Sequence, residues 1–455
     1  MSIRVQQAEA SALLRELRRD VDKNVSNHEQ HAKALERLKV LGRDARNVSE
    51  IYDRAGIDTL GHYAFNELPN PVYQEALRCL ANALLLLPQT RESAIELDLD
   101  KRATQKLQTS SSDDEFLLAR ILFLLTYAPT MNLEPLILEQ DMAKSIVRLL
   151  SRHADNLPKK HDIATTLDQS SSMALQETLK LLFNVSSAKP EHVAKFNPAV
   201  RPLLLMLEGL QVPDPPLQPP LSLVLNALAN LEISDGSIDE KEELRPAVER
   251  LTKILDQAVQ RYSSTELESL GVPLVTILRK VNEMASGDLR EEMKSKFLPD
   301  DEERDQPLGK SSTLASRLLR LTTSPGSLHL TEAISGLQFE LSDKDANDYV
   351  KNVGYGYAAG YLMSHKIPIP ESAQGAGDKV ASGGIPTNPI TGQRLDKEPP
   401  IEVPKMSQEE KEREAERLFV LFERLKATGV VDVKNPVEVA RDEGRFEELS
   451  DSDAD

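Results

Sequence analysis

The chain has 455 residues, 28% of them charged and 40% hydrophobic, and a formal net charge of −18. Only 4% of the residues are aromatic and none is tryptophan, a composition that favours helices packed on helices over sandwiches or barrels. The acidic balance argues against a surface for nucleic acid or for an anionic membrane. No apolar run reaches the roughly 18 residues that a membrane-spanning helix needs, and the first twenty residues do not resemble a signal peptide.

Catalytic and metal-binding patterns are missing from the sequence. Cys79 is the only cysteine, so no internal disulfide or Cys-based zinc site can form, as in proteins of a reducing compartment. Gly309-Lys310-Ser311 imitates the end of a phosphate-binding loop, but residue 304 is Arg where the first glycine must stand. The glycines of Gly354–Gly360 have the wrong spacing for a dinucleotide-binding turn. We therefore expect a cytoplasmic protein that is not an enzyme and that has no catalytic residues, metal or cofactor.

Apolar residues recur at helical spacing up to about residue 365, which predicts an all-α fold. The clearest segments are Tyr73–Leu87, Glu115–Tyr127, Ala174–Ser187, Pro220–Leu231, Leu270–Ala285 and Ser312–Leu321. Several of them are apolar nearly all round, as the inner helices of stacked repeats are. More amphipathic helices, such as Ala143–His153 and Leu244–Tyr262, lie between them.

Four of these segments share a short pattern. Glu75–Asn82 aligns with Glu177–Asn184, and the segments around Arg120 and Asn226 fall into the same frame. The steps between aligned positions are 42, 60 and 46 residues, close to the roughly 40–47 residues of armadillo and HEAT units with one insertion. We therefore predict an armadillo/HEAT-type superhelix over residues 1–365. The alternative is a globular helical bundle, in which the spacing would be less regular.

A set of polar residues recurs on these otherwise apolar helices, where burying an unpaired polar group would cost about 1–3 kcal/mol. The set is Arg78, Asn82, Arg120, Lys180, Asn184, Asn226 and Asn230. In an armadillo stack the third helix of each repeat lines a groove, and side chains there can hydrogen-bond a bound peptide. We predict that the set lines a partner-binding groove. The alternative, that the asparagines only tie neighbouring loops together, stays open for each residue.

The composition changes after residue 365. From 366 to 406 the Gly, Pro and Ser content rises and the helical period vanishes, which predicts a flexible linker. Ser407 and Glu410 then form a capping-box signature at the start of an amphipathic helix, which should end at Gly429. Its apolar stripe includes Leu418, Phe419, Phe422 and Leu425.

Residues 407–446 are predicted to form C-terminal partner-binding helices, the second beginning at Asn435-Pro436. A helix behind a long flexible tether is an inefficient way to build a core, because ordering the tether costs entropy. We therefore expect the first helix to bind a partner, docking on its own solenoid being the alternative. Residues 401–455 carry 9 Lys/Arg against 16 Asp/Glu, and 447–455 should be an acidic disordered tail.

A series of short strings, spread in order along the chain, resembles the synembryn family of exchange factors and folding chaperones for heterotrimeric G-protein α subunits. The strings are Glu75–Asn82, Leu118–Thr126, Glu177–Asn184, Val353–Gly360, Asn388–Gly392, Met406–Leu418 and Leu421–Leu425. They cover most of residues 70–430. The lack of tryptophan and the single cysteine are similar to the fungal branch of the family.

The resemblance implies a superhelix whose groove takes the C-terminal helix of an α subunit, while the segment after the linker reaches its nucleotide-binding domain. GDP would then leave, and the empty state would be held until GTP binds, a population shift by differential binding. The resemblance also implies a monomer that serves G protein-coupled receptor signalling and reaches the plasma membrane through its partner. The competing function is a generic armadillo adapter for peptides, whose grooves pair asparagine with the tryptophan that is absent here.

One departure from the family concerns regulation. Animal members resemble one another in an acidic, phosphorylatable cluster before the Asn-Pro-x-Thr-Gly string, whereas here Ser372, Ser382 and Thr387 lack acidic residues at the following positions. Ser450 and Ser452, each with an aspartate three positions later, are the candidate phosphosites instead.

Overall fold

The computed structural model describes residues 2–23, 25–157, 167–233, 238–370, 387–388 and 390–399, with Ser407, Glu410, Arg413, Glu414, Arg417, Phe419 and Val420. The chain divides into two compact units, residues 1–397 and 398–455. The first unit is a stack of helices that runs from α1 (Ile3–Asp22) to α21 (Tyr355–Ser364). The described ranges contain no β-strand, and an antiparallel bridge pairs Thr387 with Arg394. The prediction of an all-α fold is confirmed.

A continuous column of helices, each packed on the one before it, runs through the first unit and is named here the inner column. It consists of α2 (His28–Leu41), α5 (Asn70–Leu86), α8 (Ser112–Leu125), α11 (Gln169–Ala188), α13 (Leu221–Asn230), α16 (Val272–Met284) and α19 (Leu328–Leu341). The aligned strings of the sequence lie on consecutive members of this column. The armadillo/HEAT-type arrangement is therefore the one that the chain adopts.

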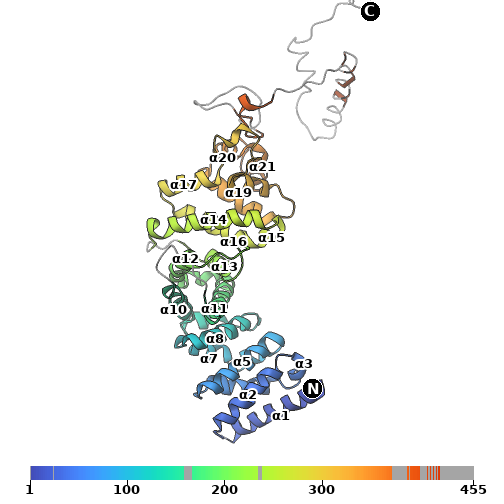
Figure 1. The fold of residues 1–455 in the computed structure, drawn as a ribbon, viewed down its shortest axis with the longest axis vertical. Helices are drawn as coiled ribbons and strands as arrows, with labels where there is room; N and C mark the ends of the chain where they lie inside the picture. Colours follow the sequence, from blue (N-terminus) through green and yellow to red (C-terminus); the bar gives the residue numbers. More distant parts are fainter. Residues whose placement is uncertain are drawn as a thin grey trace, which may run out of the picture. The chain divides into compact units, whose positions relative to one another are not determined.

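A second column packs beside the first and is named the outer column. It consists of α4 (Arg54–Phe65), α7 (Leu99–Gln108), α10 (Met142–Asp155), α12 (Val200–Gly209), α14 (Arg245–Arg261), α17 (Gly287–Phe297) and α18 (Leu314–Thr322). In Figure 1, α10 lies to the left of α11 and α12 lies to the left of α13. From α4 to α16 each inner helix thus packs against one outer helix, whereas α19 packs against both α17 and α18.

Short helices complete the repeats. They are α3 (Ala45–Val48), α6 (Thr90–Glu96), α9 (Leu133–Leu138), α15 (Ser264–Leu270) and α20 (Ala346–Val353), with 3-10 turns at Pro190–Lys195, Asn197–Ala199, Glu303–Asp305 and Leu395–Lys397 and a π turn at Glu240–Leu244. Of these, α6, α9 and the turn at Pro190–Lys195 each lead from an inner helix toward the next outer one. This is the short, outer, inner order of an armadillo repeat.

The two columns differ in sequence because they differ in surroundings. In α8 the buried positions include Leu117, Leu118, Ala119, Leu122 and Leu124, which cover most of the helix circumference, because the helix packs on two column neighbours as well as on α7. The outer helices α10 and α14 bury one stripe only, as their amphipathic sequences predict. One hydrophobic core runs from the first helices to α21.

Ser312–Leu321, one of the clearest predicted segments, forms α18, whose single buried stripe suits the outer column. The inner helices α2 and α19 were not among the predicted segments. In α19 the polar side chains of Ser335, Gln338 and Glu340 are buried among the apolar ones, and such residues hide the apolar signal of an inner helix.

The linker expected over residues 366–406 is also not free throughout. Ile367 packs against the hydrophobic core, and Gln393 is 6% exposed. The backbone amide of Leu308 donates a hydrogen bond to the carbonyl oxygen of Thr391 at 3.0 Å. The part at 387–397 therefore belongs to the first unit, because its backbone is hydrogen-bonded to the last repeat.

In the second unit the described residues contain the predicted capping box. The backbone amide of Ser407 donates to Glu410 Oε2 at 2.9 Å, and the amide of Glu410 donates to Ser407 Oγ at 3.3 Å. Phe419 and Val420 are helical and 38% and 51% exposed. Leu418, Phe422 and Leu425, like the candidate phosphosites Ser450 and Ser452, lie outside the described residues.

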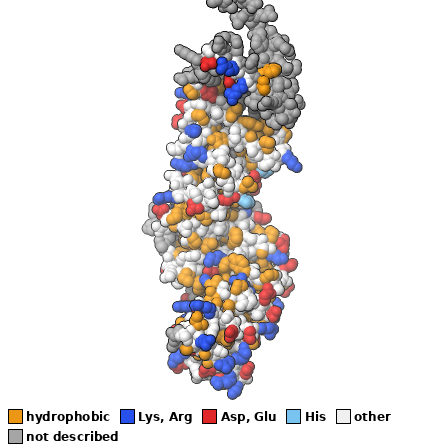
Figure 2. Space-filling model, turned by 90° about the vertical axis from the view of Figure 1, so that its right-hand side faces the viewer, with side chains coloured by type: hydrophobic (Ala, Val, Ile, Leu, Met, Phe, Trp, Pro, Cys, Tyr) orange, Lys and Arg blue, Asp and Glu red, His pale blue; other side chains and the backbone are white. Residues whose placement is uncertain are grey.

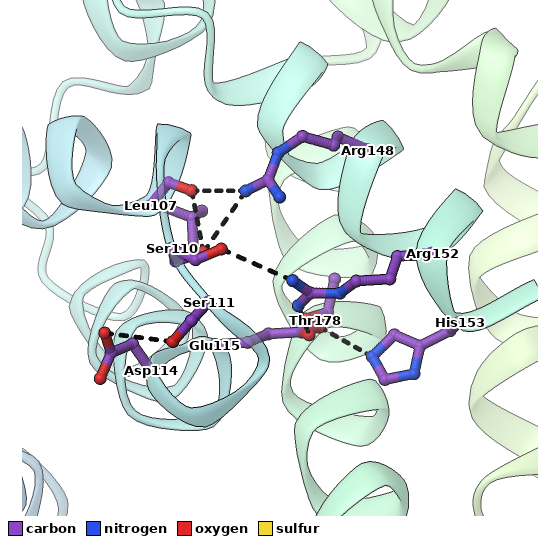
Figure 3. Close-up of polar contacts among 9 residues, drawn as sticks. All are labelled: Leu107, Ser110, Ser111, Asp114, Glu115, Arg148, Arg152, His153 and Thr178. Carbon is purple, nitrogen blue, oxygen red and sulfur yellow. Dashed lines mark hydrogen bonds and ion pairs between the residues drawn. The ribbon is translucent and has the colours of Figure 1, made fainter. Parts of the chain in front are cut away.

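A buried carboxylate joins three helices at the longest step of the repeat series (Figure 3). The side chain of Glu115 on α8 is 1% exposed. Its oxygens accept from Arg152 Nη2 at 2.5 Å, from His153 Nε2 at 2.9 Å and from Thr178 Oγ1 at 2.6 Å. Burial alone would raise the pKa of Glu115, but the hydrogen bonds from His153, Thr178 and Arg152 outweigh it, so the pKa is lowered. The charged form of Glu115 thus braces α8, α10 and α11.

We expect Glu115→Gln to lower the free energy of unfolding by about 3 kcal/mol near neutral pH, because Arg152 and His153 lose their carboxylate partner. Because the folded-state pKa of Glu115 lies below its ordinary value of 4.5, its charge stabilises the fold above that value and this stabilisation is lost as the pH falls through the folded-state pKa. Acidification should therefore destabilise the wild type more than the variant in urea unfolding.

The matched control is Glu96→Gln, which removes one partner of an exposed ion pair with Arg54 and should change stability by less than about 0.5 kcal/mol. Equal unfolding curves for Glu115→Gln and the wild type near neutral pH would contradict the bracing role.

Candidate partner-binding surface

The predicted groove residues lie together on the inner column, along α5, α8, α11 and α13. All seven are partly exposed, whereas most neighbouring positions on the same helices are buried. On α8 the partly exposed positions Phe116, Arg120 and Phe123 follow the i, i+4, i+7 spacing of one helix face, and the exposed Tyr127 lies just beyond the end of the helix. We name the side of the inner column that these residues share the inner face. Figure 2 looks onto the side of the molecule on which the inner column lies, and hydrophobic side chains gather over its middle, with Lys and Arg among them.

Carboxylates at matching positions hold the cations of the inner face. Glu75 on α5 accepts from Arg78 Nη1 at 2.5 Å and pairs with Lys39 of α2 at 2.6 Å. Glu177 on α11 repeats the arrangement with Lys180 at 3.0 Å and Arg120 of α8 at 3.2 Å. In each case one glutamate links its own helix to the preceding inner helix. Because the cations are held in place, less side-chain entropy is lost when they meet a ligand.

Three of the four asparagines of the predicted set, Asn82, Asn184 and Asn230, bond backward along the column. Asn82 Nδ2 donates to the carbonyl oxygen of Lys39 at 3.4 Å, and Asn184 Nδ2 donates to Thr126 Oγ1 at 2.8 Å. Asn230 Nδ2 donates to Ser187 Oγ at 2.7 Å. These contacts are those of the alternative interpretation, in which the asparagines tie neighbouring elements together. They leave Arg78, Arg120 and Lys180 as the charged residues of the row.

Two cations of the same column were missed from the sequence. Lys280 on α16 donates to the carbonyl oxygens of Ala229 and Leu231 at 2.6 Å each, and burial lowers its pKa. Arg279 is hydrogen-bonded to Glu340 of α19, which raises the pKa of the arginine. The sequence contains a signal for both residues, because each is a cation on an otherwise apolar helix, as Lys180 is. They were missed because the aligned pattern does not extend to α16.

Aromatic rings lie among the cations in the middle of the inner face. Lys180 Nζ is 5.7 Å from the ring centroid of Phe123, and the Arg120 guanidinium is 5.6 Å from that of Phe116. Phe123 and Tyr127 pack edge to face at 5.3 Å. Tyr127 is 55% exposed and Phe183 37%. Exposed aromatic groups beside ordered cations are typical of surfaces that bind another protein.

At the N-terminal end the inner face is hollowed between α2 and α5. The hollow has a volume of about 510 Å³, and Lys33, Glu36, Gln74, Glu75 and Arg78 are among its lining residues. Its walls carry both signs of charge. It continues the row of Arg78 toward the N-terminus.

Catalytic chemistry finds no support on the part of the chain that the structure describes. Gly309 has φ +85°, and a Cβ there would lie 2.2 Å from Tyr357 Oη, so the imitation of a phosphate-binding loop is filled by a side chain. No group of three His, Cys, Asp or Glu residues suited to a metal ion occurs in the described ranges. None of the described helices is long and apolar enough to cross a membrane.

Comparison with known proteins decides the family. The sequence profile described as guanine nucleotide exchange factor synembryn matches residues 34–445. The chain belongs to the synembryn family. A synembryn-like chaperone of Schizosaccharomyces pombe is 28% identical over 304 residues, which is 61% of this chain but only 56% of that protein. Chaperone Ric-8A of Rattus norvegicus is 24% identical over 438 residues, which is 86% of this chain and 80% of that protein.

Similar solved structures include two engineered proteins. One has a TM-score of 0.43 at 14% identity and covers 82% of this chain and 89% of its own. The other has a TM-score of 0.39 at 16% identity and covers 59% and 97%. Within the synembryn family, the strings that carry the resemblance include the Glu-x-x-Arg/Lys-x-x-x-Asn pattern, and in this member that pattern builds the inner face.

We expect Asn184→Ala to lower the free energy of unfolding by about 1 kcal/mol, because it removes the hydrogen bond to Thr126 Oγ1. A double-mutant cycle with Thr126→Val, measured by urea unfolding, should return a coupling of about 0.5–1 kcal/mol. If the changes in unfolding free energy of the two substitutions were strictly additive, Asn184 would not brace the stack. It would then count among the residues that face the ligand.

Proposed function

We propose that this chain is a guanine nucleotide exchange factor and folding chaperone whose inner face binds the C-terminal helix of a heterotrimeric G-protein α subunit. The observation that carries the proposal is the row of ordered cations and exposed aromatic rings on α5, α8 and α11, in a chain of the synembryn family. An amphipathic helix laid on this row would place its apolar anchors against Phe123, Tyr127 and Phe183. Its acidic residues or its chain end would meet Arg78 and Lys180.

Exchange by this surface needs no covalent step. The chain binds the nucleotide-free α subunit more tightly than the GDP-loaded one, so binding shifts the population toward the empty state. A shift from 1:99 to 99:1 requires a difference in binding free energy of about 5.5 kcal/mol. GTP, which the empty subunit binds, reverses the shift and releases the partner. The C-terminal helix is held on the inner face while the nucleotide site is open.

Chaperoning uses the same contacts. A nascent α subunit exposes apolar helix faces before its domain is complete, and such faces aggregate. Covering the C-terminal helix until nucleotide binds would prevent that. We place the protein in the cytoplasm as a monomer, reaching the plasma membrane with its partner. Its C-terminal helix, beginning at Ser407, would make a second contact on the nucleotide-binding domain of the same subunit.

The direct experiment is GDP release from a purified α subunit, followed with a fluorescent nucleotide, with and without the full chain. We expect faster release, and tighter binding of the nucleotide-free form than of the GDP form. A generic peptide adapter is the competing function. It would bind the isolated C-terminal peptide but would show no preference between the two nucleotide states.

We expect Arg78→Glu and Lys180→Glu each to weaken binding of a peptide that copies the C-terminus of the α subunit by about tenfold, because each reverses a charge of the inner face. Fluorescence anisotropy measures the affinity. Lys144→Glu is the matched control, since Lys144 lies on the outer helix α10 with an 81% exposed side chain, and its affinity should equal that of the wild type. Unchanged peptide affinity in both inner-face variants, with their folding intact, would separate these cations from partner binding.

A chain that ends at Lys405 should keep its thermal stability and its affinity for the C-terminal peptide but release GDP more slowly than the full chain, because the second contact is lost. Phe419→Ala combined with Phe422→Ala is the narrower variant and should act in the same direction. A fall of many degrees in melting temperature would instead assign the helix to the core. Full exchange activity in both variants would mean that the C-terminal helix has no role in GDP release.

A further inference from the structure

Two strings that the resemblance singled out, Val353–Gly360 and Asn388–Gly392, meet at the last repeat. The backbone amide of Gly356 donates to the carbonyl oxygen of Ile390 at 3.1 Å. The amide of Leu308 donates to the carbonyl oxygen of Thr391 at 3.0 Å. Backbone hydrogen bonds thus join three segments that are far apart in the sequence, so the second string is fixed to the solenoid.

The docked segment, residues 387–388 and 390–397, is named the anchor hairpin. Asn388 Oδ1 accepts from the amides of Ile390 at 2.9 Å and Thr391 at 3.2 Å, which is the local turn that asparagine favours. The amide of Gly392 donates to the Asn388 carbonyl at 2.8 Å, and the amide of Asn388 donates to the Gln393 carbonyl at 2.7 Å. The Asn-Pro-x-Thr-Gly string therefore closes on itself and presents its outer carbonyls to the last repeat.

Buried polar side chains hold the hairpin on the solenoid. Arg304, 8% exposed, donates to the carbonyl oxygen of Gly392 at 3.2 Å and also to the last carbonyls of α20. Its own carbonyl accepts from the amide of Arg394 at 2.8 Å. Gln393, 6% exposed, donates to the carbonyl oxygen of Asp305 at 3.1 Å. Releasing the hairpin would give up several buried hydrogen bonds at once, which favours the docked state.

Glycine is required where the segments touch. Gly392 has φ +67°, and a Cβ there would lie 2.3 Å from Leu308 Cδ1. Gly354 has φ +81°, and a Cβ there would lie 3.2 Å from the Ile390 carbonyl oxygen. Both positions combine a left-handed backbone with a close approach. Gly354 and Gly356 of the Val353–Gly360 string thus make room for the hairpin.

We propose that the anchor hairpin is a positioning device that shortens the tether of the C-terminal partner helix, and this proposal rests on the proposed function. Without the hairpin the chain between the solenoid and Ser407 would comprise 41 residues, 366–406. With it, the chain between the last anchored residue and Ser407 comprises nine, 398–406. The effective concentration of a tethered contact falls roughly as the −3/2 power of tether length, so the anchor raises it about tenfold.

The test uses the full chain and an α subunit. Gly392→Ala should release the hairpin, because its Cβ collides with Leu308. Gly360→Ala is the matched control, since a Cβ at Gly360 meets nothing within 4 Å. Hydrogen exchange of Gly392→Ala should show that the amides of Leu308 and Gly356 lose their protection. Amides in the other repeats should keep theirs. A second variant keeps Gly392 and inserts about thirty Gly/Ser residues after Glu398, which restores the long tether without touching the fold.

Both the released and the lengthened variant should bind the nucleotide-free α subunit about tenfold more weakly than the wild type, while Gly360→Ala binds normally. Affinity for the isolated C-terminal peptide should stay unchanged in all of them. Full affinity in the lengthened variant, or in Gly392→Ala once its amides are exposed, would overturn the proposal, and so would retained amide protection in Gly392→Ala. Should Gly392→Ala fail to fold, the lengthened variant decides. Failure of the proposed function itself would look different, since the wild type would not bind the α subunit.

Discussion

The packing of each inner helix against its two neighbours in the column is the constraint on which the rest depends. A helix such as α8 touches α5, α11 and α7 at once, so its apolar residues cover most of its circumference and only one strip faces outward. Polar residues are tolerated only on that strip or where they find a partner, because an unpaired buried group is costly. Stacking repeats of this kind is therefore enough to produce a continuous inner face. The chemical character of that face depends on the few positions of each helix that face outward.

Electrostatics adds order to that strip. The chain as a whole is strongly acidic, yet the inner face presents Arg78, Arg120 and Lys180, each held by Glu75 or Glu177. The same glutamates join successive helices, so the carboxylates that brace the stack also hold the cations of the inner face. The step between α8 and α11 is the longest in the series, and there Glu115 supplies a second, buried brace from the outer side. A partner that binds across this step would thus meet a surface that is rigid before it arrives.

The helical periodicity predicted the column well, because burial on several sides leaves a strong apolar signal in α5, α8, α11 and α13. It missed α19, whose buried Gln338 and Glu340 are satisfied by contacts from other repeats that no local pattern reveals. The row of polar residues was predictable as a set, but the direction of each asparagine was not, since Asn184 is fixed by Thr126, 58 positions earlier. The anchor hairpin was mistaken for linker because its composition is that of a loop. Only the tertiary contacts of Arg304 and Gln393 distinguish a docked loop from a free one.

The central claim, that the inner face receives the C-terminal helix of an α subunit, is tested most directly by site-specific photo-cross-linking in the nucleotide-free complex. A photoreactive phenylalanine analogue at Phe183 on α11 is compared with one at Leu205 on the outer helix α12, since both side chains are exposed to a similar extent, 37% and 43%. The account predicts that position 183 cross-links to the C-terminal helix of the α subunit and that position 205 does not. Cross-links from 205 without any from 183 would contradict it.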